Sequence, residues 1–381
     1  MKLTVALIHQ EKKLRTGAHF INELMSQELQ KRGVRIRHFY PRATLVDAPR
    51  HLKGLNNILF FHSLLEHRKE ILKCDLVQGT TYTPLALLTF GIPVVSHFGS
   101  TTDGFLKAVP QTHDLSPSLR KVWAELRKDG VIDTLNIPTR RPLRDIAEIE
   151  HYVATQASAV IATSEIVARD LRAVGVPGSR IHVIHNAIED FWFDHPPVPA
   201  ARPSLIYLGR LGDDPFTLKL KGFDRLVACW RSFPSAPKRT FCISTNEALT
   251  KWMSEKIPSH EVRANVLKDR VCAELRRESG SILLMPSRYE GFGLSLVEGM
   301  SQGLIPVTAQ VGVAPEIIEN GKNGFLVRDE KAMIRAVRTL LGDARLRARL
   351  SVGAMRTAHA FRASILADRL IEVYKDVLER A

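Results

Sequence analysis

The chain has 381 residues, 45% of them hydrophobic and 25% charged, which is enough to bury the cores of two globular domains. Lysine and arginine exceed aspartate and glutamate by 54 − 40 = 14, which favours an anionic partner such as a nucleotide phosphate, a nucleic acid or a membrane surface. No apolar run is long enough to cross a membrane, and the four cysteines lack the C-x-x-C spacing of a zinc site. We therefore expect a globular protein of the reducing cytoplasm.

Short apolar runs alternate with helix-like segments through the first half of the chain. The first run, residues 3–9, is too short for a signal peptide and is expected as the first strand. Further strands are expected over residues 34–40, 75–80, 92–98, 159–164 and 180–186. The intervening segment that ends at Gly33 has the pattern of a helix with a glycine C-cap. This alternation predicts a parallel, doubly wound sheet.

Half of the positive excess lies in residues 31–73, which hold ten lysines or arginines against three acidic residues. Within it, the apolar residues of segment 51–73 recur at roughly helical spacing. A basic helix with an apolar face can lie on an anionic bilayer, and the same pattern also fits a core-facing helix with a solvated basic side. The sequence leaves both alternatives open.

The connection from residue 99 to residue 142 is long and contains seven lysines or arginines. A helix is expected near residues 118–130. Long connections that carry function are more often binding elements than spacers. We therefore expect this connection to help bind a ligand in the N-terminal half.

Residues 194–203 contain four prolines in ten positions and are expected to form a stiff linker. After them the alternation restarts, with strands expected over residues 204–211, 239–245, 281–287 and 304–310. This predicts a second α/β domain. Because open α/β sheets bind ligands at the carboxyl ends of their strands, we expect the chemistry in a cleft between the two domains.

The most informative motifs lie in the second domain. Arg210 follows an expected strand and Lys221 precedes an expected helix, a combination that favours an anion site. In SRYEGFGLSLVE, residues 287–298, Glu290 precedes a Gly-x-Gly turn and Glu298 lies about two helical turns further on. The glycines allow the backbone to approach a ligand closely, and a carboxylate so placed can hold the vicinal hydroxyls of a ribose.

Several segments together resemble the retaining, nucleotide-sugar-dependent glycosyltransferases of family 4. They are LGRL…LKLKGFDRL, SRYEGFGLSLVEGMSQGLIPV, APEIIENGKNGFLV and VIATSEIVARDLRAVGVPGSRIHVIHNAIEDFW. The resemblance runs over nearly the whole chain and implies the GT-B architecture, in which two Rossmann-like domains face a central cleft. It implies an acceptor-binding domain over residues 1–195, a nucleotide-sugar-binding domain over residues 196–363, and a last helix, 364–381, that packs back on the N-terminal domain.

The resemblance also implies roles for single residues of the second domain. Arg210 and Lys221 would neutralise the diphosphate of the donor as it leaves. Glu290 would contact the hydroxyls of the transferred sugar, and Glu298 would hold the ribose. The backbone of the turn would support the sugar or the phosphate, through residues Gly291, Phe292, Gly293 and Leu294.

Further roles are implied for residues around this centre. In the first domain, Gly17 would face the diphosphate and His97 would lie near the 6-position of the sugar. Asn265 or Val266 would touch the nucleotide base. The chain departs from the family pattern at Thr16–Gly17, where paired glycines are usual, and at Ser244, where a glycine-containing segment is usual. A third departure is the loop at Gly312, which has a single glycine.

The expected reaction is transfer of a hexosyl-type group from a UDP- or GDP-sugar to an acceptor hydroxyl with retention of configuration. Front-face attack is preferred, and a nucleophilic Glu290 that forms a covalent intermediate is the minority hypothesis. No metal or other cofactor is expected, because the chain lacks an Asp-x-Asp motif at a strand end.

The basic segment 31–73 favours an anionic or membrane-embedded acceptor in lipopolysaccharide, polysaccharide or glycolipid biosynthesis at the inner face of the cell membrane. A soluble small-molecule acceptor is the alternative. A nucleotide-sugar epimerase of the same fold is a further alternative. A nucleic-acid-binding protein is the least favoured, because no basic stripe interleaved with aromatic residues is present.

Overall fold

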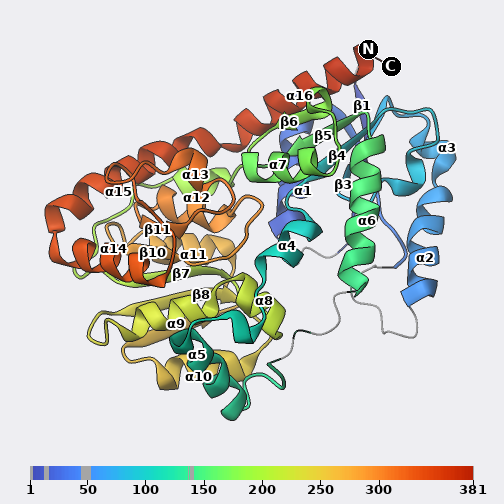
Figure 1. The fold of residues 1–381 in the computed structure, drawn as a ribbon. Helices are drawn as coiled ribbons and strands as arrows, with labels where there is room; N and C mark the ends of the chain where they lie inside the picture. The colour runs from blue at the N-terminus through green and yellow to red at the C-terminus, as the bar shows by residue number, and fades with distance from the viewer. Residues whose placement is uncertain (1–2, 13–16, 44–52, 136, 138–140, 381) are drawn as a thin grey trace. The chain divides into compact units, whose positions relative to one another are not determined.

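The computed structural model of the chain describes all residues except 1–2, 13–16, 44–52, 136, 138–140 and 381 (Figure 1). The side chains of residues 17–19, 53–55 and 141–142 also lie outside the description. The expectation for Thr16 therefore falls outside the described residues, as do parts of the basic segment 31–73 and of the connection 99–142.

Two parallel sheets of six strands each form the framework, which confirms the predicted α/β fold. The first sheet has the order β2-β1-β3-β4-β5-β6. Its strands are β1 (Thr4–Ile8), β2 (Arg35–Phe39), β3 (Leu76–Thr80), β4 (Val94–Phe98), β5 (Ala159–Ala162) and β6 (Ile181–Val183). The second sheet has the order β12-β11-β10-β7-β8-β9. Its strands are β7 (Leu205–Arg210), β8 (Lys238–Ile243), β9 (His260–Ala264), β10 (Ile282–Met285), β11 (Ile305–Ala309) and β12 (Phe325–Val327).

The chain divides into two compact units, and neither is one continuous stretch of sequence. Unit 1 consists of Met1–Asp103, Arg141–Glu189 and Phe361–Ala381, and unit 2 consists of Gly104–Arg140 and Asp190–Ala360. The chain therefore passes between the units four times. These boundaries differ from the continuous domains expected over residues 1–195 and 196–363.

Helices cover both faces of the sheet of unit 1. They are α1 (Gly17–Lys31), α2 (Lys53–Leu65), α3 (Arg68–Ile71), α6 (Arg141–Gln156), α7 (Glu165–Ala173) and α16 (Ala363–Glu379). On one face, Gln78 of β3 donates to Met25 Sδ of α1 at 3.8 Å and accepts from the hydroxyl of Tyr374 of α16. On the other face, side chains of β1, β3 and β4 pack in a core cluster with Phe60 of α2 and Leu171 of α7. The last helix thus belongs to unit 1.

The basic segment expected as one helix over residues 51–73 forms two. Helix α2 ends at Leu65, and the carbonyl of His67 accepts the amides of Glu70 and Ile71 to begin α3. Phe60 and Ile71 are fully buried, whereas Ile58 is 65% exposed. The segment therefore has a core-facing side and also leaves apolar side chains in solvent.

The segment Gly104–Arg140 packs on unit 2, which corrects the expectation that the connection 99–142 belongs to the acceptor-binding half. After α4 (Thr102–Ala108) comes α5 (Pro117–Lys128), which buries Trp123 and its apolar neighbours in the core of unit 2. The indole of Trp123 donates to Asp224 Oδ2 at 3.2 Å, and the indole of Trp252 donates to Asp129 Oδ2 at 2.9 Å. Apolar burial and these two hydrogen bonds decide the attachment.

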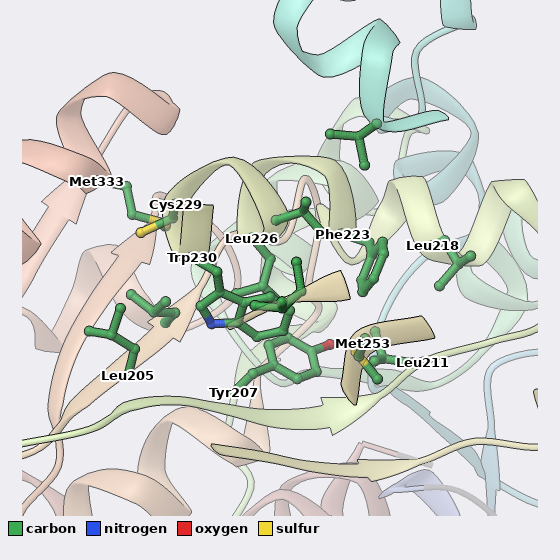
Figure 2. Packing of buried hydrophobic residues seen from close by; sticks show 14 of the residues in the cluster. Leu205, Tyr207, Leu211, Leu218, Phe223, Leu226, Cys229, Trp230, Met253 and Met333 are labelled. Carbon is green, nitrogen blue, oxygen red and sulfur yellow. The ribbon is translucent and has the colours of Figure 1, made fainter. Parts of the chain in front are cut away.

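The core of unit 2 lies between its sheet and the helices that follow each strand. These helices are α8 (Pro215–Leu220), α9 (Phe223–Arg231), α10 (Glu247–Lys256), α11 (Lys268–Leu275), α12 (Leu294–Ser301), α13 (Ala314–Ile317), α14 (Glu330–Gly342) and α15 (Ala344–Ala358). Figure 2 shows Phe223, Leu226 and Trp230 of α9 packed over Leu205 and Tyr207 of β7. All five side chains are at most 2% exposed. The end of β7 is therefore supported by closely packed side chains.

In the described part of the chain there are also five short 3-10 helices: η2 (Leu85–Leu87), η3 (Thr112–Asp114), η4 (Gly178–Arg180), η5 (Asp190–Phe193) and η6 (His359–Phe361). The proline-rich segment 194–203, which was expected to link the domains, lies inside unit 2. The amide of Val198 donates to the carbonyl of Arg276 at 2.7 Å, and that of Ala200 donates to Ser279 at 2.9 Å. None of the helices in the described part of the chain is long and apolar enough to span a membrane.

Candidate functional site

The carboxyl ends of β7 and β10 lie on neighbouring strands of unit 2, and each is followed by a turn that carries predicted site residues. After β7, the Asp214 carboxylate caps α8 by accepting the Thr217 amide at 2.9 Å, and Lys221 ends that helix. The next residue, Gly222, has φ +66°, and a Cβ there would lie 2.1 Å from the carbonyl oxygen of Pro286. Only glycine lets the turn after α8 approach the loop after β10 this closely.

This close approach brings Lys221 and Glu290 together. Lys221 Nζ lies 2.7 Å from Glu290 Oε1, and the hydroxyl of Ser287 donates to the same oxygen at 2.7 Å. The side chains of Lys221 and Glu290 are only 21% and 16% exposed. The two residues, 69 positions apart in sequence, thus form one partly buried ion pair with a shared hydroxyl donor.

The Gly-x-Gly turn after Glu290 ends at the start of α12. Gly291 and Phe292 are buried, Gly293 is the N-cap residue, and Leu294 is the first residue of the helix. The loop at Gly312 packs on this turn, since the amide of Val313 donates to the carbonyl of Phe292 at 2.9 Å. Gly312 has φ +54°, and its Cβ would lie 2.2 Å from that carbonyl. The single glycine of this loop therefore stands where a close contact requires it.

Glu298 lies inside α12, with only 8% of its side chain exposed. Its Oε1 is 2.8 Å from Nζ of Lys268, the first residue of α11. The sequence analysis did not find Lys268, because nothing in its neighbourhood signals a partner 30 residues away. The structure thus gives each glutamate of the Glu-x7-Glu motif its own lysine.

Tyr207 supports the end of β7 from beneath. Its hydroxyl donates to the carbonyl of Arg210 at 3.3 Å, and burial together with the nearby Glu290 carboxylate raises its pKa well above the usual value. The phenol therefore stays protonated and able to donate. Arg210 itself is exposed, and its guanidinium forms no ion pair within the described residues.

A buried network holds the loop that carries Glu290. Arg288 donates to both carboxylate oxygens of Asp224 at 2.8 Å, and the two side chains are 6% and 0% exposed. Arg288 also donates to the carbonyl of Lys219 at 2.7 Å. Because Asp224 also accepts from Trp123, the helix α5 is tied to the same network as the Lys221–Glu290 pair.

The residues expected to touch a base lie after β9. Asn265 has φ +58°, and its amide group is used on the backbone of Ser244, accepting at 3.1 Å and donating at 2.8 Å. The side chain of Asn265 is thus committed to holding the loop after β8. Ile243 and Leu267, at the same edge of the sheet, are 46% and 73% exposed. They are apolar surfaces of the kind on which a base can stack.

In unit 1, the structure places Gly17 as the first residue of α1 and His97 within β4. His97 is 3% exposed, and burial lowers its pKa to about 4, an effect partly offset by the side chain of Asn186. The imidazole is therefore neutral at ordinary pH. Its Nε2 has no hydrogen-bond partner among the described residues.

A buried carboxyl group lies close to the end of β4. Glu150 of α6 accepts the amide of Thr102 at 2.8 Å and its hydroxyl at 2.9 Å. Burial, with a smaller contribution from the charge of Asp103, raises the pKa of Glu150 to about 7. This carboxyl was not singled out by sequence because it sits in an ordinary amphipathic helix.

The structure brings Lys221, Glu290 and the turn 291–294 together in unit 2, with Glu298 in the helix that follows. Gly17 and His97 belong to unit 1. Lys268, Tyr207, Asp224 and Arg288 are the additions that the structure makes. No group of three or more histidine, cysteine, aspartate or glutamate side chains suited to a metal ion occurs in the part of the chain that the structure describes.

Two family matches cover most of the chain. Residues 16–187 match the family described as "Glycosyl transferase 4-like domain", and residues 189–356 match "Glycosyl transferases group 1". The chain belongs to the family 4 glycosyltransferases. This confirms the family that the motifs indicated.

Known proteins support the same assignment. The alpha-maltose-1-phosphate synthase of Mycolicibacterium smegmatis is 24% identical over 271 residues, which are 60% of this chain and 66% of that protein. The chain thus spans slightly less than two thirds of this relative. Sucrose-phosphate synthase from Thermosynechococcus elongatus has a similar structure, with a TM-score of 0.78 at 15% identity and 100% coverage of both chains.

A third similar protein is WaaG, described as a glycosyltransferase involved in lipopolysaccharide biosynthesis. Its structure matches with a TM-score of 0.68 and 16% identity, over 97% of this chain and 99% of WaaG. At this identity the two structures establish the shared fold. The predicted GT-B architecture is therefore confirmed.

Proposed function

We propose that the protein transfers a hexosyl group from a nucleoside-diphosphate sugar to an acceptor hydroxyl with retention of configuration. The observation that carries the proposal is the Lys221–Glu290 pair at 2.7 Å, placed beside the N-terminus of α12. A cation and free backbone amides favour a phosphate, while a carboxylate held beside them can accept from sugar hydroxyls. Both ends of a sugar nucleotide would find a partner there.

In this proposal Arg210 and Lys221 neutralise the diphosphate as it leaves, with the amides of Gly293 and Leu294 close by. Glu298 accepts from the ribose hydroxyls, and Lys268, 2.8 Å away, orients that carboxylate. The base lies against the backbone of Val266, because the side chain of Asn265 already binds Ser244. A mass-spectrometric screen for hydrolysis of UDP- and GDP-sugars tests the proposal. If none is hydrolysed or bound, the proposal is wrong.

Glu290 acts in this proposal as a sugar-binding group and not as a nucleophile. Its Oε1 accepts from both Lys221 and Ser287, an arrangement that orients the carboxylate and reduces its nucleophilicity. Attack by the acceptor on the face from which the diphosphate leaves then accounts for retention. Proton NMR of the first product formed gives its anomeric configuration. A covalent sugar adduct isolated on Glu290 would instead establish double displacement.

The transfer is proposed to need no metal ion. Arg210 and Lys221 supply positive charge where the diphosphate develops its negative charge. In metal-dependent enzymes a bound divalent cation has this role. Activity should therefore survive incubation with EDTA. Complete loss on chelation, reversed by added manganese, would contradict this part of the proposal.

The acceptor is proposed to be anionic and held at a membrane surface, as in the biosynthesis of lipopolysaccharide, other surface polysaccharides or glycolipids. The supporting observation is the surface of α2, where Ile58 and Leu65 are 65% and 40% exposed and lie one heptad apart on one side of the helix. Arg68 and Lys69, just beyond α2, are exposed. Three other cations of this basic segment are already paired with Glu70 or Glu66: Arg37, Arg42 and Lys73.

Vesicle flotation tests the membrane surface. Wild type should bind phosphatidylcholine vesicles that contain phosphatidylglycerol, and Ile58→Ser with Leu65→Ser should weaken binding about tenfold or more because two apolar side chains no longer enter the interface. Arg68→Gln with Lys69→Gln should weaken it by roughly 30-fold, since each of the two cations near an anionic surface contributes about 1 kcal/mol. Val352→Ser, at an exposed apolar residue of unit 2, is the matched control.

A soluble small-molecule acceptor is the second candidate. It is favoured by the names of two similar proteins, a maltose-1-phosphate synthase and a sucrose-phosphate synthase. If wild type does not float with vesicles that contain phosphatidylglycerol and glycosylates a soluble sugar or sugar phosphate, this candidate replaces the membrane acceptor. In either case we propose that the reaction takes place in the cytoplasm, consistent with four buried, unpaired cysteines.

A further inference from the structure

Arg288 and Tyr289, the two residues before Glu290, are both held by a segment that lies far away in the sequence. This segment, Gly104–Arg140, belongs to unit 2, as does the loop that carries Glu290. The contacts between the segment and the loop are therefore internal to one compact unit. Because a side chain is only as well placed as the backbone that carries it, these contacts bear on the position of the Glu290 carboxylate.

The ring of Tyr289 lies directly against the backbone of α4. A Cβ at Gly104 would lie 2.4 Å from Cε2 and from Cζ of this ring, far closer than two carbon atoms can pack. The ring of Phe105 meets it edge to face, with the ring centroids 5.3 Å apart and an angle of 82° between the planes. Tyr289 is only 7% exposed. Glycine is a poor helix former, and this close approach explains its presence in α4.

Arg288 is held through two residues that the same segment contacts. Its guanidinium donates to the carbonyl of Lys219 at 2.7 Å and to both carboxylate oxygens of Asp224 at 2.8 Å. The ammonium group of Lys219 is fully buried, donates to Thr112 Oγ1 at 2.7 Å and lies 5.3 Å from the centroid of the Trp123 ring. The indole of Trp123 donates to Asp224. Since a buried ammonium group is costly unless it is bonded, Thr112 helps to fix Lys219 and the carbonyl that Arg288 contacts.

The Glu290 carboxylate is a group for which such support matters. Its Oε1 accepts from Lys221 and Ser287, and in the proposed function the carboxylate also accepts from the sugar. A displacement of about 1 Å can lower a rate by roughly 100-fold, even when the change that causes it lies away from the reacting atoms. Contacts that restrict the two preceding residues therefore restrict the part of the loop on which turnover depends.

We propose that Phe105 and Thr112 are positioning residues for Glu290. Phe105 acts through the ring of Tyr289, and Thr112 acts through Lys219. This role rests on the proposed function and extends it to a part of unit 2 that comes from the first half of the sequence. Both residues act on turnover through Glu290, so their effect on kcat depends on the presence of that carboxylate.

The test measures kcat for hydrolysis of the sugar nucleotide that wild type hydrolyses fastest, in a double-mutant cycle with Glu290→Gln. Phe105→Leu removes the edge-to-face contact and Gly104→Ala displaces the Tyr289 ring, so each should lower kcat about tenfold. In the Glu290→Gln background the same changes should lower kcat by less than a factor of about two, because the group that they position is gone.

Thr112 provides a second pair of variants. Thr112→Val removes the acceptor of the Lys219 ammonium group at nearly constant volume and should lower kcat roughly fivefold. Thr112→Ser keeps the hydroxyl and should restore the wild-type value. Arg231→Gln is the matched control, because the pair of Arg231 with Glu125 joins the same segment to the far end of α9. This variant should keep wild-type kinetics.

Binding of UDP or GDP separates this role from general damage to the fold. The Kd of the nucleotide should agree with wild type within a factor of about two in Gly104→Ala and Phe105→Leu. A loss of nucleotide affinity in step with kcat, or equal losses of kcat with and without Glu290, would overturn the proposal and leave these contacts with a structural role. If wild type hydrolyses no sugar nucleotide and binds neither UDP nor GDP, the proposed function itself fails and this role falls with it.

Discussion

The carboxyl edges of the two sheets differ in whether their buried side chains form ion pairs. In unit 2 three buried or half-buried carboxylates each meet a cation, in the pairs Asp224–Arg288, Glu290–Lys221 and Glu298–Lys268. In unit 1 the corresponding edge carries an uncharged His97 and a Glu150 bonded by Thr102. The first edge is suited to an anionic ligand such as a diphosphate. The second edge offers neutral hydrogen-bonding groups instead.

The largest effect should come from breaking the most deeply buried pair of unit 2. Asp224→Ala leaves Arg288 charged and Trp123 without an acceptor, so it should destabilise unit 2 by about 3–5 kcal/mol. Urea unfolding followed by tryptophan fluorescence measures the change. Glu319→Ala removes an exposed pair with Lys322 and should cost less than about 1 kcal/mol. If both variants lost the same free energy of unfolding, the expected difference between buried and exposed ion pairs would be contradicted.

Loss of the lysine beside Glu290 tests whether the charged edge serves the reaction. Lys221→Met should lower kcat/KM by roughly 10²–10³-fold, because one cation that stabilises the leaving diphosphate is gone. Glu290→Gln should lower kcat to a similar degree, and the double variant should lose less than the product of the two. Lys251→Met, at a 75% exposed lysine of α10, is the control and should keep wild-type kinetics.

Glu150 of unit 1 has no cationic partner among the described residues. This difference from unit 2 should be visible in the pH dependence of the protein's stability. With its pKa raised to about 7, Glu150 retains its proton in the folded protein at pH values where the unfolded chain has lost it. The stabilisation that protonated Glu150 provides is complete below about pH 4.5 and is lost as the pH rises through about 7. The Glu150→Gln variant should therefore become more stable relative to wild type as the pH is raised. The difference in free energy of unfolding should change by up to roughly 3 kcal/mol, and Tm should rise accordingly.

Differential scanning calorimetry between pH 5 and pH 8 measures this trend. Glu261→Gln, at a surface carboxylate of β9, should show a constant offset from wild type. A Glu150→Gln offset that stays constant with pH would mean that the carboxyl is ionised in the folded protein, and the contrast between the two edges would then weaken.

The smallest effect is expected at the second glutamate of the motif. Glu298→Gln should raise KM for the donor about tenfold and change kcat by less than a factor of about three, because a ribose contact is made equally in the ground and transition states. Lys268→Met should give a weaker change in the same direction, since it acts through Glu298. A large fall in kcat with unchanged KM would place Glu298 at the reacting centre.

The strands and the Glu-x7-Glu motif were predictable because both are local patterns. Short apolar runs placed β1 to β8, β10 and β11 to within about three residues, and the motif lies within twelve consecutive positions. The partners of its glutamates were not predictable. Lys268 and Lys221 come from other βα units, and their distances follow from the order of strands in the sheet.

The attachment of α5 was also beyond the sequence. The apolar residues of α5 predict a buried face, and the basic residues around them suggested a ligand. Neither pattern indicates which of the two cores the helix packs in. The hydrogen bond from Trp123 to Asp224 decides that question.

The interleaved course of the chain has a consequence for engineering. A chimaera that exchanges everything after residue 190 for a relative's sequence would keep the native α5 on a foreign α9, and Trp123 would face a pocket that did not evolve with it. A graft that moves Gly104–Arg140 together with Asp190–Ala360 transfers a complete folding unit. Exchange of unit 2 as a whole therefore requires four junctions.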